Sequence, residues 1–315
     1  MGFVLRWIIE PGFWSSSPVQ IALVIGGSSA VVSAVVGVFT VLRGQSFAGH
    51  ALTDVSTAGG SGALLLGVGP IVGFVGLGII GAGVMDAIGV RRLRGRDLAT
   101  GVVLGASIGL AALILYLDST SRATTGATQQ ILFGSIFSIQ SSTVPVVVVL
   151  GLAALVIVGV LYRPLLLSTV GAEMAVARGV PERLVGVLFM VAMAVAVGLS
   201  SLTIGAILST ALLIGPAAAA VRLTARIGWS LLLAAGLGLA ACWIGVLLAY
   251  DSYYWTSSHR SLPVSFFIVA LVFGFYLASG AGARMHRRSL VHQAEPTPTV
   301  AGPAAKSAVP PPPGG

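Results

Sequence analysis

Apolar runs of about twenty residues, enough to cross the hydrocarbon core of a bilayer as a helix, recur along almost the whole chain, and arginine residues fall mainly between them. Only 8% of the residues are charged and 56% are hydrophobic. In a soluble domain about 25% of the residues are charged. The sequence therefore predicts an all-α polytopic membrane bundle of about nine transmembrane helices. The predicted spans cover residues 19–42, 46–66, 70–90, 98–117, 143–162, 184–199, 203–221, 229–250 and 263–280.

The basic residues predict the orientation, because cytoplasmic loops carry an excess of arginine and lysine. With the N-terminus outside, fourteen of the seventeen basic residues fall on the cytoplasmic side. Around the membrane domain at 19–280, the sequence predicts an external interfacial lead-in at 1–18, with no convincing cleavable signal peptide, and a disordered cytoplasmic tail at 281–315. The tail is expected to be disordered because it is basic and proline-rich.

Glycines at four-residue spacing predict close helix packing in two places. Gly69 and Gly73 lie at the start of the third predicted span, and Gly101, Gly105 and Gly109 lie on the fourth. Small residues at this spacing let two membrane helices approach each other closely. These glycines are therefore interpreted as packing positions without chemistry of their own.

The second predicted span contains an ionisable pair, His50 and Asp54, followed by a run of small residues at 58–63. Ionisable side chains inside a membrane cost about 2.5–3.5 kcal/mol on insertion scales, and they persist mainly where a cavity or ligand uses them. Four-residue spacing places both side chains on one helical face. Imidazole and carboxylate suit Zn²⁺, Mn²⁺ and Fe²⁺ without separating the three. The pattern predicts a metal pathway; the alternative is a neutral His50 that hydrogen-bonds Asp54 and only stabilises the helix.

The chain lacks the residues that bind the phosphates of ATP in a phosphate loop. It has no Gly-x-x-x-x-Gly-Lys-Ser/Thr motif, and its single lysine, Lys306, falls in the predicted tail. Its single cysteine, Cys242, excludes an intramolecular disulfide. We therefore predict a transport subunit that is not itself an enzyme. Its driving force is either a coupling ion or ATP hydrolysis on a separate chain.

The segment after the fifth predicted span has the composition expected where such a chain docks. Residues 170–183 combine small side chains with a glycine and a following proline, which predicts a short cytoplasmic coupling helix that ends near Gly179. A helix with small side chains fits a groove on a partner protein. The alternative is an amphipathic connector lying on the membrane. The predicted coupling residues are Gly171, Ala172, Glu173, Ala175, Arg178 and Gly179.

Several stretches together resemble the permease subunit of the zinc, manganese and iron family of ABC importers. They are residues 41–54, 96–101, 132–135, 161–180 and 204–220, and the resemblance extends over roughly residues 20–280. It implies a translocation path formed by two copies of the chain in a bacterial plasma membrane. It also implies cytoplasmic ABC ATPase subunits, an extracytoplasmic metal-binding protein, and a divalent metal ion as cargo with no permanently bound cofactor.

The chain departs from the family pattern at two points. The family usually reads Gly-Asp-Ala-Leu-Ser-His, whereas residues 49–54 read Gly-His-Ala-Leu-Thr-Asp. The acid and the imidazole have exchanged places, so one of each remains on the same face, which favours a metal role. The family also usually has an aspartate near Gly171, where this chain has only Glu173 nearby.

Three other interpretations remain open. An ABC permease for iron chelates or corrinoids shares the general layout, but such chains usually have more spans and no His/Asp pair at mid-membrane. An ion-coupled secondary transporter normally shows inverted repeats, and the sequence contains no convincing internal repeat. An intramembrane enzyme is least favoured, because His259, His286 and His292 fall in loops or the tail and supply no second metal cluster.

Overall fold

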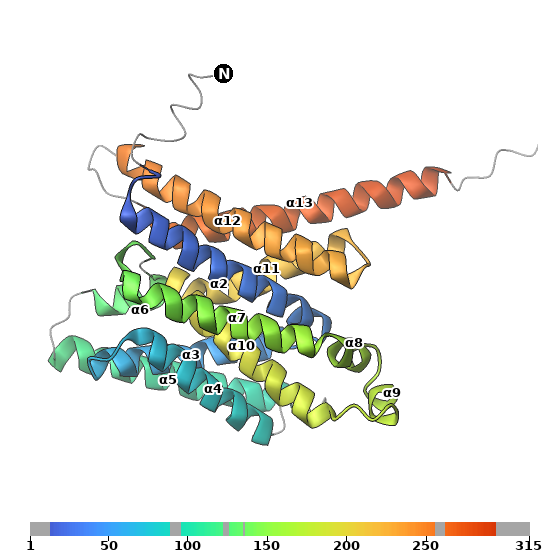
Figure 1. Ribbon diagram of the computed structural model, residues 1–315, viewed down its shortest axis with the longest axis horizontal. Helices are drawn as coiled ribbons and strands as arrows, with labels where there is room; N and C mark the ends of the chain where they lie inside the picture. The colour runs from blue at the N-terminus through green and yellow to red at the C-terminus, as the bar shows by residue number, and fades with distance from the viewer. Residues whose placement is uncertain (1–12, 89–95, 122–125, 135, 256–261, 294–315) are drawn as a thin grey trace, which may run out of the picture.

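The computed structural model describes residues 13–88, 96–121, 126–134, 136–255 and 262–293 (Figure 1). All regular structure in these residues is helical. Nine long helices coincide with the predicted spans, which confirms the all-α membrane bundle. They are α2 (Ser17–Leu42), α3 (Ser46–Leu65), α4 (Pro70–Ile88), α5 (Arg96–Ser121), α7 (Val144–Val160), α10 (Glu182–Ile204), α11 (Ala206–Leu223), α12 (Ile227–Trp255) and α13 (Val264–Gln293).

Short helices join the long ones at the two ends of the bundle. Between α5 and α7 lie α6 (Ala127–Phe133) and the 3-10 helices η1 (Ile136–Ser138) and η2 (Ser141–Thr143). Between α7 and α10 lie α8 (Tyr162–Val170) and α9 (Ala172–Ala177). The C-terminal part of α13 projects from the same end of the bundle as α8 and α9, and α6 lies at the opposite end (Figure 1).

The structure describes parts of the two predicted terminal segments. The tail is predicted to be disordered from residue 281, but α13 continues to Gln293, because the residues there include good helix formers such as alanine, leucine and arginine. In the lead-in, the ring of Phe13 is buried and packs edge-on against Trp14 and Tyr250 at 5.2 and 5.3 Å. The remaining parts of both predicted segments, 1–12 and 294–315, lie outside the described residues.

The helix α3 is the exception among the long helices. The other eight are long and apolar enough to cross a membrane, whereas the polar residues of α3 make it less apolar. It packs against α4, α5, α10 and α11, and 13 of its 20 residues are buried. A polar helix is tolerated at membrane depth where protein rather than lipid surrounds it.

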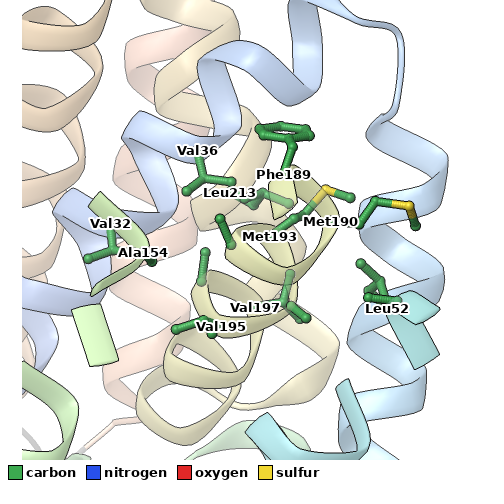
Figure 2. Packing of buried hydrophobic residues seen from close by; sticks show 14 of the residues in the cluster. Val32, Val36, Leu52, Ala154, Phe189, Met190, Met193, Val195, Val197 and Leu213 are labelled. Atoms are coloured by element: carbon green, nitrogen blue, oxygen red, sulfur yellow. The ribbon is translucent and has the colours of Figure 1, made fainter. Parts of the chain in front are cut away.

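The core of the bundle is centred on α10. Its residues 192–201 are all buried, and Ser33 Oγ of α2 donates a hydrogen bond to the carbonyl oxygen of Ala196 at 3.1 Å. Figure 2 shows side chains from five helices meeting around α10: Val32 and Val36 of α2, Leu52 of α3, Ala154 of α7, Met193 and Val197 of α10, and Leu213 of α11. Because lipid is as apolar as these side chains, close packing rather than exclusion of water holds them together.

The predicted glycine contacts are confirmed at one position and wrong at four. A Cβ atom on Gly73 would collide with the backbone of Gly59, and one on Gly59 with the backbone of Gly73, so α4 and α3 meet backbone to backbone. Within the described part of the chain, no atom lies within 4 Å of a Cβ built on any of the other four. The reason on α5 is that Thr100, Ala111 and Leu115 turn toward the bundle, which leaves its glycine face pointing outward. The four are Gly69, Gly101, Gly105 and Gly109.

Candidate functional site

A stripe of polar residues runs along one face of α3. Its members, His50, Asp54, Thr57 and Ser61, follow each other at the three- and four-residue intervals of one helical face. The hydroxyl of Thr57 donates to the carbonyl oxygen of Thr53 at 2.7 Å, and that of Ser61 to the carbonyl oxygen of Thr57 at 2.8 Å. These hydroxyls satisfy backbone groups of their own helix. The two ionisable side chains nearest the start of α3 are therefore the members of the stripe suited to a ligand.

The side chain of His50 contacts α11. Its Nδ1 atom lies 3.0 Å from the hydroxyl oxygen of Thr210, which also lies 3.3 Å from the hydroxyl oxygen of Thr53. No hydrogen bond joins His50 to Asp54 in the described structure, although the two side chains are close enough to attract each other electrostatically. Sequence reasoning missed Thr210, although it lies within the 204–220 stretch that carries part of the family resemblance.

Asp54 carries an unpaired buried atom. Its Oδ2 atom is buried and no hydrogen-bond donor contacts it in the described structure. A buried acceptor without a partner has lost its hydration without replacement, at a cost of about 1–3 kcal/mol and more for a charged group. A cation at this oxygen would remove that cost, and the imidazole one turn earlier would add a nitrogen ligand. The donor set therefore fits a divalent metal ion.

The protein supplies few ligands here. Among the described residues, no three or more His, Cys, Asp and Glu side chains are placed so that they could hold a metal ion together. His50 and Asp54 alone leave most coordination positions to water or to another chain. Two ligands alone would bind a metal ion weakly, and weak binding suits a pathway because transport requires release as well as capture.

Close packing holds α3 in place behind this pair. A Cβ atom on Gly60 would lie 2.6 Å from the ring of Phe74, and one on Gly49 would lie 2.9 Å from Cδ2 of Leu213. The small-residue run at 58–63 therefore lets α4 approach α3. The structure thus gives this run a packing role. His50 and Asp54 lie on the same helix, which α4 and α11 contact closely through these glycines.

Arg43 ties the start of α3 to the short helices between α7 and α10. Its Nη1 atom donates to the hydroxyl of Ser168 in α8 at 2.6 Å, and its guanidinium carbon lies 5.6 Å from the ring centroid of Phe189 in α10. The chain then turns sharply at Gly44, where φ is +61°, and α3 begins. The first turns of α3 are thus attached through Arg43 to α8.

The predicted coupling residues form a short helix at one end of the bundle (Figure 1). Gly171 precedes α9 with an extended backbone, and Ala172 and Glu173 begin the helix. Ala175 is fully buried. The predicted end at Gly179 is confirmed: its φ of +76° is a left-handed conformation that glycine adopts without strain.

The exposed surface of α9 is partly apolar. Met174 and Val176 are 56% and 58% exposed, and Arg178 is exposed beside them. These two are the large apolar side chains that the described part of α9 exposes. The composition of this segment predicts contacts through its small residues, and sequence reasoning missed the exposed Met174 and Val176. Their alternation with alanine in Met-Ala-Val-Ala was the available signal.

The fold and the site define a multi-pass helical membrane protein that holds an ionisable pair in a polar long helix enclosed by its neighbours. This construction is typical of a membrane transport protein. A model of the ABC 3 transport family matches residues 16–279. The chain therefore belongs to the ABC 3 transport family and is a transport subunit in the plasma membrane.

Similar proteins carry names of manganese transport. The chain is 30% identical over 274 residues to the manganese transport system membrane protein MntC of Halalkalibacterium halodurans, a match that covers 87% of this chain and 92% of that protein. It is also 30% identical over 233 residues to the manganese import system permease protein ScaB of Streptococcus pneumoniae, with 74% and 81% covered.

Solved structures share the fold. PsaBC from Streptococcus pneumoniae in complex with Fab superposes with a TM-score of 0.73 at 24% identity, covering 88% of this chain and 95% of that chain. An ABC transporter classed as metal-chelate type, in an inward-facing conformation, superposes with a TM-score of 0.63 at 17% identity, covering 84% and 85%. At these identities the likeness establishes the fold alone.

Proposed function

We propose that the chain is the permease of an ATP-driven importer of a divalent metal ion, with manganese as the first candidate ahead of zinc and iron. The observation that carries the proposal is the buried Oδ2 atom of Asp54, which has no donor and lies one helical turn from His50. Relatives named for manganese transport support the choice of metal. A carboxylate oxygen together with one imidazole nitrogen also accepts Mn²⁺ readily.

The metal ion is cargo, and the permease performs no bond chemistry on it. His50 and Asp54 act as transient ligands while the ion passes along the polar face of α3. A chelate arrives with its coordination positions already filled, so an importer of chelates has little use for such a pair. For this reason the pair favours a bare ion over an iron chelate or a corrinoid.

The transporter is a multi-subunit assembly. Two copies of the chain form the path, an extracytoplasmic protein delivers the metal ion, and two cytoplasmic ABC ATPase subunits bind below. The excess of arginine at one end of the bundle orients α8 and α9 toward the cytoplasm and the N-terminus outside. The exposed Met174 and Val176 of α9 offer an apolar contact to the ATPase. Closure of the ATPases then moves α9 and rocks the helices between outward and inward states.

The proposal is tested by substituting the two ligands in the whole transporter. His50→Ala and Asp54→Ala should each lower manganese uptake by about tenfold or more, since neither remaining half-site holds a dication well. The exchange His50→Asp with Asp54→His keeps both ligand types on one face and should retain substantial uptake. Uptake of radioactive manganese is measured in cells that lack other manganese importers, at matched amounts of permease in the membrane.

Ser61→Ala is the matched control. Ser61 lies on the same stripe, but its hydroxyl donates to its own helix, so uptake should stay near the wild-type value. Normal uptake by both single alanine variants would contradict the proposal. Disappearance of these variants from the membrane fraction would assign the pair a folding role instead.

A further inference from the structure

Four groups near the candidate site form a continuous chain of hydrogen bonds between α3 and α11. His50 Nδ1 lies 3.0 Å from Thr210 Oγ1, and Thr210 Oγ1 lies 3.3 Å from Thr53 Oγ1. Thr53 Oγ1 in turn lies 3.1 Å from the carbonyl oxygen of Gly49. Thr53 is fully buried, so no water replaces a partner that its hydroxyl fails to find in the protein.

The direction of each hydrogen bond follows from counting protons. A hydroxyl has one hydrogen, and a backbone carbonyl can only accept. Thr53 Oγ1 lies closer to the carbonyl oxygen of Gly49, at 3.1 Å, than to Thr210 Oγ1, at 3.3 Å, which favours the bond to Gly49 for its single hydrogen. Thr53 is then the acceptor in its contact with Thr210, which places the single hydrogen of Thr210 on that bond. Thr210 has no hydrogen left to donate to His50, so the imidazole must be the donor.

The outcome of this count is a single tautomer of the neutral imidazole. The proton lies on Nδ1 and is donated to Thr210, which leaves the lone pair of Nε2 free. In metal sites a ligating histidine almost always donates its other ring N–H to a neighbouring acceptor, which fixes both the tautomer and the orientation of the ring. The opposite tautomer requires the hydroxyl of Thr53 to turn away from the carbonyl oxygen of Gly49 and donate to Thr210 instead, which breaks the shorter of its two contacts.

We propose that Thr210 and Thr53 are positioning residues that hold His50 in the Nδ1-protonated tautomer and present Nε2 to the metal ion. The role rests on the proposed function, because it assigns the ligand atom of that same site. Neither threonine needs to touch the ion. Thr210 acts on it through the imidazole, and Thr53 acts through Thr210 by accepting the hydrogen that Thr210 would otherwise offer to Nδ1.

The tautomer can be measured without any metal ion. Nitrogen-15 resonances of the histidine rings are recorded on the full-length permease in lipid nanodiscs, and the His50 signals are assigned by their loss in His50→Ala. Wild type and Thr210→Ser, which keeps the hydroxyl, should both show protonated Nδ1 at a pH where His50 is neutral. Thr210→Val keeps the shape of the side chain and removes the acceptor, so the Nδ1-protonated signal should be lost or strongly reduced.

Thr203→Val is the matched control. The hydroxyl of Thr203 is buried and donates to backbone carbonyls of its own helix α10, so this variant should leave the His50 resonances unchanged. The same variants are then titrated with Mn²⁺ in the assembled transporter. Thr210→Val should weaken Mn²⁺ affinity about 10–100-fold, as loss of a partner behind a ligating histidine typically does, and Thr210→Ser should restore it.

Three results separate this role from the proposed function. Protonated Nε2 in the wild type, or an unchanged tautomer in Thr210→Val, overturns the hydrogen-bond chain. A changed tautomer with unchanged Mn²⁺ affinity overturns the positioning role and leaves the transport function standing. Normal manganese uptake by both His50→Ala and Asp54→Ala removes the proposed pathway itself, and the positioning role with it.

Discussion

The helices α3 and α7 belong to one bundle but follow opposite rules of composition. α7 has no polar side chain, and only four of its 17 residues are buried, namely Val147, Gly151, Ala154 and Val158. α3 contains His50, Asp54 and several serines and threonines, yet 13 of its 20 residues are buried. The most apolar helix is therefore largely exposed, whereas the polar helix α3 is enclosed, which is the reverse of the pattern in a soluble protein.

The difference follows from the solvent. Lipid tails are as apolar as valine, so a valine-rich helix gains little by moving from lipid into the bundle. A helix with unpaired polar groups loses several kcal/mol if lipid surrounds it, so it must lie among other helices. Small residues then decide how closely the neighbours approach. The comparison can be tested by asking which kind of change each helix tolerates.

The largest effect is expected at the contact between α3 and α4. Gly59→Ala places a methyl group against the backbone of Gly73, which neither helix can relieve without moving apart. Overpacking of a well-packed site costs about 1–3 kcal/mol and occasionally more, and a collision between two helix backbones is expected to exceed that range. We expect the yield of monodisperse permease to fall severely, as measured by size-exclusion chromatography after extraction at a fixed expression level.

The matched control is Gly159→Ala in α7. A Cβ atom at Gly159 meets no atom within 4 Å in the described structure, and replacing glycine by alanine in a helix stabilises it by about 0.4–1 kcal/mol. This variant should be recovered at or above the wild-type yield. An equal fall in the yield of monodisperse permease for both variants would show that glycine has the same role in α3 and α7, which would contradict the proposed difference between them.

The next effect is expected on the exposed face of α7. Val149 is 65% exposed, so Val149→Asp places a carboxylate on the face that meets lipid, at a cost of about 2.5–3.5 kcal/mol on insertion scales. The amount of inserted permease, measured by membrane fractionation, should fall, whereas Val149→Leu should leave it unchanged. Full insertion of Val149→Asp would show that protein covers this face.

The sequence predicts the long helices well because membrane thickness fixes their length. All nine predicted spans match a helix, including α3, which is less apolar than the eight helices long and apolar enough to cross a membrane. His50 and Asp54 also stand out in the sequence, since ionisable residues are rare at membrane depth.

Contacts between distant segments are not predictable in this way. Thr210 lies 160 positions from His50, and nothing in either local pattern reveals that they meet. The same holds for Arg43 and Ser168, which are 125 positions apart. The glycine pattern predicts contacts that are absent for a related reason. Four-residue spacing shows that one face of a helix carries only small residues, but only the fold shows whether another helix packs on that face.

The smallest effect separates two kinds of polar residue within α3 itself. The hydroxyl of Thr53 is paired on both sides, so Thr53→Val should lower the thermal stability of the permease, by about 1 kcal/mol in free energy of unfolding.

The Oδ2 atom of Asp54 is buried without a donor. Asp54→Leu removes that unpaired acceptor and should raise stability by about 1–3 kcal/mol while it abolishes manganese uptake. Thermal unfolding of the purified permease and uptake in cells measure the two properties separately. A gain in stability with a loss of transport is expected where a fold keeps a costly group for its cargo. If Asp54→Leu instead lowers stability as Thr53→Val does, Asp54 is a structural partner of another group, and α3 is polar for the sake of packing alone.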